Sequence, residues 1–258
     1  MKASMLEKVG CLLNLFSFEQ PEWGVREAAE ALDIPKSTVG DLLLHLAEQG
    51  ILSKTESGRY SLGWRLFELS QILIEHTAFC IEARKAMREL VERWGETVHL
   101  AVLDGIQVLF VEKLQATPAV EILLSRVGSR LSAHEVGVGK VLLAAQEPYR
   151  LPALLDQLPL DAPRTPNTIT SREQLERALE QVRSQGYAYD REEATQGLCC
   201  VAAPLYDLGG RVPAAISLCI PAYRFYAQKD HYTEVIVQAA RGISEKLAGA
   251  TCAIRENG

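Results

Sequence analysis

Three cysteines in the C-terminal half, Cys199, Cys200 and Cys219, are the side chains of this chain best suited to chemistry. Together with His99 or His134 they could form a metal cluster, or a nucleophile with its base. Adjacent residues on a strand point to opposite faces, so Cys199 and Cys200 cannot readily bind one ion. Free cysteines usually behave as small buried hydrophobes, which is the favoured role. A redox role stays open if Cys200 and Cys219 lie on neighbouring strands within bridging distance.

A second candidate site is the glycine-bearing stretch Gly137-Val138-Gly139-Lys140, which precedes an apolar run and predicts a loop that leads into a helix. It does not fit a phosphate-binding loop, because the first glycine of that motif would fall at His134 and Val141 replaces the required Ser or Thr. Lys140 could neutralise an acidic ligand or point to solvent. His134 could line a pocket mouth, but a solvated loop position is favoured. The 5 histidines lack metal-ligand spacing, so we predict no metal site and no cofactor.

Residues 25 to 62 have the order of a winged helix-turn-helix. Val25, Ala28, Ala29 and Leu32 recur at helical spacing, and Asp33 ends that helix. Proline is favoured at helix starts, so a second helix should begin at residues 35 to 37 and run to Gly50. The alternating segments 51–54 and 59–62, around Ser57-Gly58, then predict a β-hairpin.

The second of these helices would be the recognition helix of a DNA-binding domain, laid in the major groove. Its outward positions and the hairpin supply the side chains predicted to contact DNA: Lys36, Ser37, Thr38, Gly40, Asp41, His45, Lys54 and Arg59. The local charge opposes this reading, because residues 1–75 hold seven Lys or Arg and eleven Asp or Glu, a net charge of −4. DNA-binding surfaces normally concentrate positive charge. Either the basic groups gather on one face, or each module binds weakly and relies on dimerisation.

Composition limits the class of protein. A chain of 258 residues that is 48% hydrophobic can bury substantial cores, and two domains fit this length better than one. The net charge of −6 argues against a general polyanion binder. No run of eighteen apolar residues and no signal-peptide core occurs, so we expect a cytoplasmic protein without membrane association. The 6 cysteines lack the density of a disulfide framework and should be reduced.

The rest of the chain predicts an α+β domain behind a connecting helix. A long helix should follow the hairpin from Trp64 and could pair with a partner chain. We expect further helices over residues 81–94, 171–186 and 233–248, and a short helix or loop over 151–170. Strands are expected over 99–112, as a hairpin turning at Asp104-Gly105, and over 120–124, 187–190, 199–206 and 212–220. The predicted domains are 1–62, a linker helix 63–78, and 79–258.

Four motifs occur in an order that resembles the IclR family of bacterial transcriptional regulators. They are Ile34-Pro35-Lys36-Ser37-Thr38-Val39, Gly58-Arg59-Tyr60-Ser61-Leu62-Gly63, the run Gly137 to Ala144, and Gly186-Tyr187-Ala188-Tyr189-Asp190 with Cys200-Val201-Ala202-Ala203-Pro204. The resemblance covers residues 6 to 248. It implies a winged helix-turn-helix, a linker helix and a GAF-like domain that binds a small organic or aromatic acid. Such proteins act as dimers or pairs of dimers on operator DNA and control catabolic operons.

The resemblance also implies an effector site. It would comprise Gly137 and Val138 at the start of a helix, together with Asp190, Cys200 and Ser217. Free N–H groups at a helix start attract a carboxylate, which agrees with the first two. The family commonly has a second small polar residue where this chain has Cys219. Because a thiol bonds more weakly than a hydroxyl, the pocket should favour a bulkier or more apolar acid.

Two classes of function fit the sequence. The favoured one is a ligand-controlled regulator in which effector binding changes the separation of two recognition helices. Relatives often carry His or Arg where this chain has Gly40-Asp41, so operator sequence and affinity cannot be borrowed from them. The alternative is a thiol-dependent enzyme using Cys200. That reading lacks an evident base and leaves the winged helix unexplained.

Overall fold

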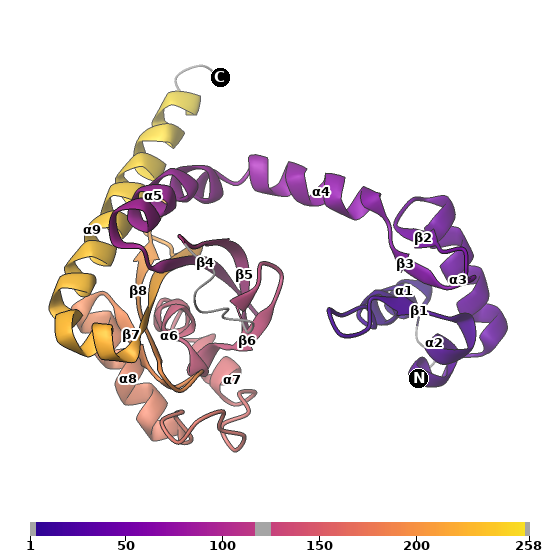
Figure 1. Ribbon diagram of the computed structural model, residues 1–258, viewed down its shortest axis with the longest axis horizontal. Coiled ribbons are helices and arrows are strands. Elements are labelled where there is room, and N and C mark those ends of the chain that lie inside the picture. Colours follow the sequence, from indigo (N-terminus) through magenta and orange to yellow (C-terminus); the bar gives the residue numbers. More distant parts are fainter. Residues whose placement is uncertain (1–3, 117–124, 256–258) are drawn as a thin grey trace. The chain divides into compact units, whose positions relative to one another are not determined.

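The chain forms two compact units, Met1–His76 and Thr77–Gly258. A computed structural model describes residues 4–116 and 125–255, with side chains up to residue 249 (Figure 1). The strand expected over 120–124 lies outside the described residues. The helix expected to link the two domains lies within the first unit. Its role as a linker stays a prediction.

The first unit is a helix-turn-helix with a small sheet. Its elements are α1 (Met5–Leu13), β1 (Glu22–Trp23), α2 (Val25–Leu32), α3 (Lys36–Glu48), β2 (Leu52–Lys54), β3 (Tyr60–Leu62) and α4 (Trp64–Glu75). The strands form an antiparallel sheet in the order β1-β3-β2. Helix α1 and strand β1 were not predicted from the sequence. A signal for α1 was present, since Ser4 and Glu7 form a reciprocal capping box at its start.

The turn between α2 and α3 has the expected chemistry. Asp33 takes a left-handed conformation with φ of 52° and ends α2, and Pro35 precedes the first residue of α3. Ala28, Val39 and Leu43 are fully buried between these helices. Gly63 brings β3 against the chain after α3: a Cβ there would lie 2.1 Å from the carbonyl oxygen of Gly50, so no larger residue fits. The predicted helix-turn-helix and hairpin are confirmed.

Helix α4 differs from the others of this unit because none of its residues is buried within the chain. Trp64 is 81% exposed, Phe67 56% and Ile72 52%. An apolar surface of this kind on a soluble protein usually marks an interaction site.

The second unit is built on a six-stranded antiparallel sheet in the order β6-β5-β4-β9-β8-β7. The strands are β4 (Thr97–Asp104), β5 (Gln107–Leu114), β6 (Arg130–Ser132), β7 (Ala188–Arg191), β8 (Leu198–Leu205) and β9 (Ala214–Pro221). Gly105 turns the β4-β5 hairpin with a φ of 61°, which agrees with the predicted Asp-Gly turn. The short edge strand β6 was not predicted.

Helices cover both faces of this sheet (Figure 1). Helices α5 (Ala78–Trp94) and α9 (Ala222–Arg255) contact each other and the sheet on one face, and α9 has a non-helical residue at Gln228. On the other face lie α6 (Gly137–Ala144), which follows the 3-10 turn Ala133–Glu135, and α8 (Arg172–Gln185). Helix α8 begins with Ser171 accepting from the N–H of Gln174 and ends at Gly186, as predicted. The short helix α7 (Leu151–Leu155) falls within the segment expected to be loop or helix. Among the described residues, no helix is long and apolar enough to span a membrane.

Candidate functional site

The sheet face toward α6 brings the predicted effector residues together through strand register. Asp190 on β7 lies opposite Cys200 on β8, which lies opposite Cys219 on β9. Ser217, two residues before Cys219 and therefore on the same face, lies opposite His99 on β4. Residues far apart in the sequence thus form two adjacent rows beneath the start of α6.

A pocket opens between these rows and α6. It measures about 450 Å³ with the space at its mouth, but the centre of a water molecule can occupy only about 40 Å³ of it, so the pocket is narrow. All six predicted effector residues line it: Gly137, Val138, Asp190, Cys200, Ser217 and Cys219. His99 and Ser125 also line it, together with apolar side chains that include Phe110, Leu131, Val136 and Leu198.

Two glycines let α6 reach this position. A Cβ on Gly139 would lie 2.1 Å from the carbonyl oxygen of Ala133, and one on Gly137 would lie 3.3 Å from the Cβ of Ala202. The glycines therefore serve close packing of α6 against the preceding turn and the sheet. The first N–H groups of α6 have no acceptor within the helix, and Gly137 and Val138 line the pocket. This end of the helix can hold an anion.

Asp190 is a buried carboxylic acid at the pocket wall. One of its oxygens, Oδ1, accepts from the backbone N–H of Glu193 at 2.7 Å and of Ala194 at 3.4 Å. Burial, opposed by the nearby charge of Lys140, raises the pKa of Asp190 to about 7. Near neutral pH the group can therefore donate or accept a hydrogen bond.

His99 is one of the pocket residues that were not predicted as effector contacts. Its side chain is 3% exposed and packs against Phe110 with ring centroids 5.2 Å apart. Its Nε2 is buried and has no hydrogen-bond partner among the residues that the structure describes. Burial, with a smaller contribution from Lys113, lowers the pKa of His99 to about 3, so the ring is neutral. A buried polar atom without a partner costs stability, and a ligand can recover that cost. No local motif marks His99, because its place in the pocket depends on the β4-β9 register.

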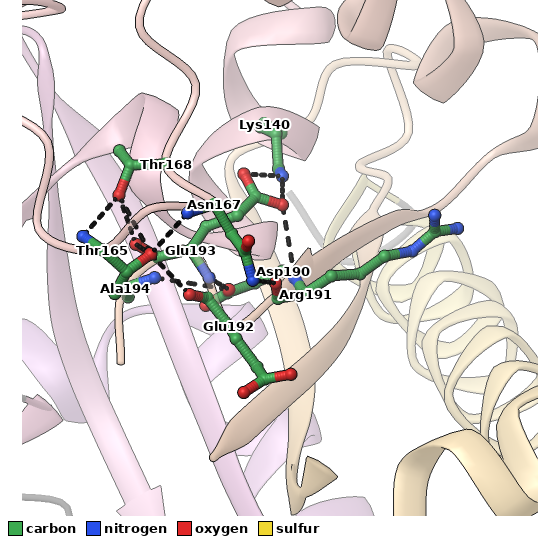
Figure 2. A network of polar contacts seen from close by, with 9 residues as sticks. All are labelled: Lys140, Thr165, Asn167, Thr168, Asp190, Arg191, Glu192, Glu193 and Ala194. Atoms are coloured by element: carbon green, nitrogen blue, oxygen red, sulfur yellow. Dashed lines mark hydrogen bonds and ion pairs between the residues drawn. The ribbon is translucent and has the colours of Figure 1, made fainter. Parts of the chain in front are cut away.

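Lys140 neither faces solvent nor enters the pocket, contrary to both expectations. Its Nζ lies 2.5 and 2.6 Å from the carboxylate oxygens of Glu193, and both side chains are buried (Figure 2). Glu193 is held further by the backbone N–H of Arg191, and its own carbonyl accepts from the hydroxyl groups of Thr165 and Thr168. The Lys140 charge is neutralised within the protein. The sequence gives no signal for this pair, whose members are separated by 53 residues.

The expectation for His134 was also wrong. The residue is fully buried, not solvated, and its Nδ1 lies 2.8 Å from the hydroxyl of Ser132. It is not among the residues that line the pocket. The glycine-bearing stretch was expected to be a loop that leads into a helix, but residues 137–140 already belong to α6 and residues 133–135 form the 3-10 turn against which it packs. This packing removes His134 from water.

The cysteines divide between the two sheet faces, as the strand alternation predicted. Cys199 is fully buried beside Tyr226 of α9, whereas Cys200 lines the pocket. The adjacent Cys219 thiol and then burial raise the pKa of Cys200. Nucleophilic cysteines need a lowered pKa, and His99, with a pKa of about 3, is a poor base. The directions of these two pKa shifts therefore oppose the thiol-enzyme alternative. Among the described residues, no group of three His, Cys, Asp or Glu side chains could hold a metal ion.

The predicted DNA contacts lie on α3 and the hairpin. Lys36, Ser37, Asp41 and His45 are exposed on α3, Thr38 and Gly40 are half-buried, and Lys54 is exposed on β2. Arg59 is engaged within the domain: its two terminal nitrogens donate to the carboxylate of Glu27 at 2.9 and 2.7 Å, and one also donates to the carbonyl of Glu22 at 2.9 Å. Arg59 thus braces the hairpin against α2. Its phosphate contact stays a prediction, as do the other seven.

Comparisons with known proteins agree with this architecture. Residues 6–56 match the IclR helix-turn-helix domain, and residues 71–245 match the bacterial transcriptional regulator IclR C-terminal domain. The HTH-type transcriptional regulator XynR of Escherichia coli is 35% identical over 244 residues, 94% of this chain and 96% of that protein. BhcR of Paracoccus denitrificans, also an HTH-type transcriptional regulator, is 33% identical over 86% of this chain and 80% of its own.

Solved structures give the same result. An IclR homologue from Microbacterium hydrocarbonoxydans, complexed with 4-hydroxybenzoate, has a TM-score of 0.84 and 29% identity and covers 95% of this chain and 100% of its own. The Thermotoga maritima IclR has a TM-score of 0.70 and 31% identity and covers 94% of this chain and 98% of its own. The chain therefore belongs to the IclR family and is a DNA-binding transcriptional regulator with a C-terminal effector-binding domain.

Proposed function

We propose that this regulator senses a small organic or aromatic carboxylic acid in the pocket between α6 and the sheet, and thereby controls a catabolic operon. The observation that carries the proposal is the buried, unpartnered Nε2 of His99 in a pocket that also receives the start of α6. A ligand oxygen would satisfy the imidazole, and the free N–H groups of α6 would hold a carboxylate.

The lining supports an acid with an apolar body. Phe110, Leu131 and Leu198 supply apolar walls, while Ser217 and Asp190 supply polar atoms. The space open to water centres suffices for roughly three water molecules, so a ligand of several more atoms requires the pocket to widen. The Microbacterium homologue with bound 4-hydroxybenzoate supports an aromatic acid as the first candidate.

The exposed residues of α3 would read the operator, and Lys36, Ser37, Thr38, Gly40, Asp41 and His45 remain the proposed contacts, with Lys54 and Arg59 on the hairpin. The exposed Trp64, Phe67 and Ile72 of α4 support a homodimer that buries this helix, and dimers could pair into tetramers. A regulator of this kind would act in the cytoplasm. Light scattering tests the dimer, and Ile72→Asp should shift the mass toward that of one chain.

Gel shifts with the gene's own upstream intergenic DNA, with and without candidate acids, test the function. Replacing both Ser37 and Thr38 by Ala should weaken operator binding about tenfold and leave effector affinity unchanged, since two hydroxyl groups near the duplex are lost. Gln49→Ala is the matched control, because Gln49 is exposed at the end of α3, away from the predicted contacts at its start. Equal loss of DNA and effector binding would show that the two hydroxyls are structural.

Ser217→Ala should reduce the response to the acid and preserve DNA affinity, whereas Ser184→Ala, exposed on α8, should change neither. An unaltered dose response in Ser217→Ala removes that residue from the site. If the upstream DNA shows no specific gel shift at low salt, the proposal that this chain controls the genes next to its own is wrong.

A further inference from the structure

The two pocket cysteines lie directly opposite each other on neighbouring central strands. Cys200 of β8 pairs in register with Cys219 of β9. Both are free thiols and both line the pocket. Cys200 is half-buried and Cys219 is 5% exposed, so any contact with a small reagent occurs through the pocket.

The pattern of hydrogen bonds between β8 and β9 places the side chains of Cys200 and Cys219 close together. The N–H of Ala222 donates to the carbonyl of Gly197 at 2.8 Å, and this pair continues the β8-β9 register. Pairs in an antiparallel ladder alternate between hydrogen-bonded and non-hydrogen-bonded types. Counting inward from Gly197 and Ala222, Cys200 and Cys219 form a non-hydrogen-bonded pair.

Two prolines agree with this assignment of hydrogen-bonded and non-hydrogen-bonded pairs. Pro221 and Pro204 have no N–H, and both fall at positions that the same alternation makes non-hydrogen-bonded. Non-hydrogen-bonded pairs have the shorter Cα separation, about 4.5 Å, and their side chains lie closer. Disulfides span Cα separations of about 4.4 to 6.8 Å, so a bridge needs little movement of the strands.

We propose that Cys200 and Cys219 are a modification site: an oxidant of the peroxide class converts them to a reversible disulfide across β8 and β9 inside the effector pocket. One thiolate attacks the peroxide, forms a sulfenic acid and releases hydroxide or water. The second thiol then displaces water from that sulfenic acid and forms the S–S bond. Two thiols lose two hydrogens, and one peroxide is reduced to two waters.

The surroundings of the pair set the character of the reaction. The Cys219 thiol and burial hold the pKa of Cys200 well above its ordinary value, so the thiolate is scarce near neutral pH. The site should therefore respond to sustained peroxide exposure and react faster as the pH rises. Once a sulfenic acid forms, the second thiol is already in place, which favours the disulfide over further oxidation.

The consequence for sensing rests on the proposed function. A bridge removes both S–H groups from the wall that faces α6, and a bound acid would shield the thiols from peroxide. Oxidation and effector binding should then oppose each other.

The test uses the full-length chain with Cys199→Ala, so that Cys200 is the only cysteine in its peptide. The protein is treated with hydrogen peroxide, blocked with N-ethylmaleimide after denaturation, digested without reductant and analysed by mass spectrometry. We expect a cross-link between the peptides that contain residues 200 and 219, which dithiothreitol reverses. The yield should rise at least severalfold from pH 7 to pH 9.

Cys219→Ser is the matched variant, and it should give no cross-link and instead accumulate more oxidised Cys200. Cys11, exposed on the first unit, reports that peroxide was active. Two results would overturn the proposal. In the first, Cys11 is oxidised while both pocket thiols still react with N-ethylmaleimide. In the second, Cys200 becomes a sulfinic acid and no cross-link forms. This readout needs no effector. A cross-link that forms while every tested acid fails to bind would therefore uphold the disulfide and count only against the acid-sensing proposal.

Discussion

Two buried polar clusters meet at Asp190, and they differ in whether the protein completes them. On one side, Lys140 and Glu193 are paired at 2.5 and 2.6 Å, and Thr165 and Thr168 hold the same loop (Figure 2). On the other side, in the pocket, one ring nitrogen of His99 has no hydrogen-bond partner in the described part of the chain. Asp190 uses one oxygen in backbone bonds to the loop and also lines the pocket.

We infer from this difference that the first cluster stabilises the fold and that the second binds the effector. A buried charge without a partner is costly, so Lys140 and Glu193 depend on each other and fix the loop that carries Asp190. An unpartnered neutral group costs less and can persist where a ligand completes it. Substitutions in the first cluster should therefore act mainly on stability, and substitutions in the second mainly on effector affinity.

The largest effect is expected from Lys140→Met, which leaves Glu193 charged and buried. Removal of one partner of a buried ion pair typically costs about 3–5 kcal/mol, so the urea midpoint of the second unit should fall strongly. The double variant with Glu193→Gln should recover a large part of the loss, because no uncompensated charge remains. If Lys140→Met alone is as stable as the wild type, the pair is not structural and Lys140 returns as a candidate for effector contact.

A smaller effect, with a defined pH dependence, is expected from Asp190→Asn. In the unfolded chain Asp190 ionises near pH 3.8, whereas in the folded protein its pKa is about 7. Between these values the folded state keeps a proton that the unfolded chain has released, so wild-type stability falls as the pH rises through this window. Asparagine retains the oxygen that accepts from Glu193 and Ala194 and does not titrate.

The unfolding free energy of the variant should therefore rise relative to that of the wild type between pH 4 and pH 7. The gain should reach up to about 4 kcal/mol, because each unit by which the pKa of Asp190 is raised corresponds to about 1.4 kcal/mol. Unfolding curves at several pH values measure this gain. A constant difference across the range would show that Asp190 is ionised throughout.

Local patterns predicted much of this molecule. The α2-α3 turn, the hairpin at Gly58 and helix α8 each carry a proline, glycine or capping residue at the point where the backbone needs it. The resemblance to the family then placed six residues that the structure brings into one pocket. Neither the local patterns nor the resemblance could predict how narrow the pocket is, because its width depends on side chains from all six strands of the sheet.

The features that were not predicted from the sequence, or were predicted wrongly, share one physical cause. His99 and the Lys140-Glu193 pair owe their roles to register and packing between segments far apart in the sequence, and no spacing rule reports such contacts. His134 was misjudged because a histidine beside a glutamate in a glycine-bearing stretch is typical of a solvated loop, whereas this stretch folds beneath α6. Short strands such as β1 and β6 form through partners on β3 and β5, not through their own sequence.

The smallest effect on stability, and the sharpest contrast, is expected from His99→Phe. The substitution removes a buried nitrogen that has no partner and keeps a ring beside Phe110, so unfolding free energy should stay equal or rise. Affinity for the acid should fall about tenfold, which corresponds to about 1.4 kcal/mol. His134→Phe is the matched control. Its Nε2 is also buried without a partner among the described residues, but its Nδ1 is bonded to Ser132 and it does not line the pocket, so the variant should lose stability and leave affinity unchanged. Isothermal titration with an acid that the wild type binds, alongside urea unfolding, measures both. If the two variants lose stability alike and bind alike, His99 does not contact the acid, and its buried position serves packing alone.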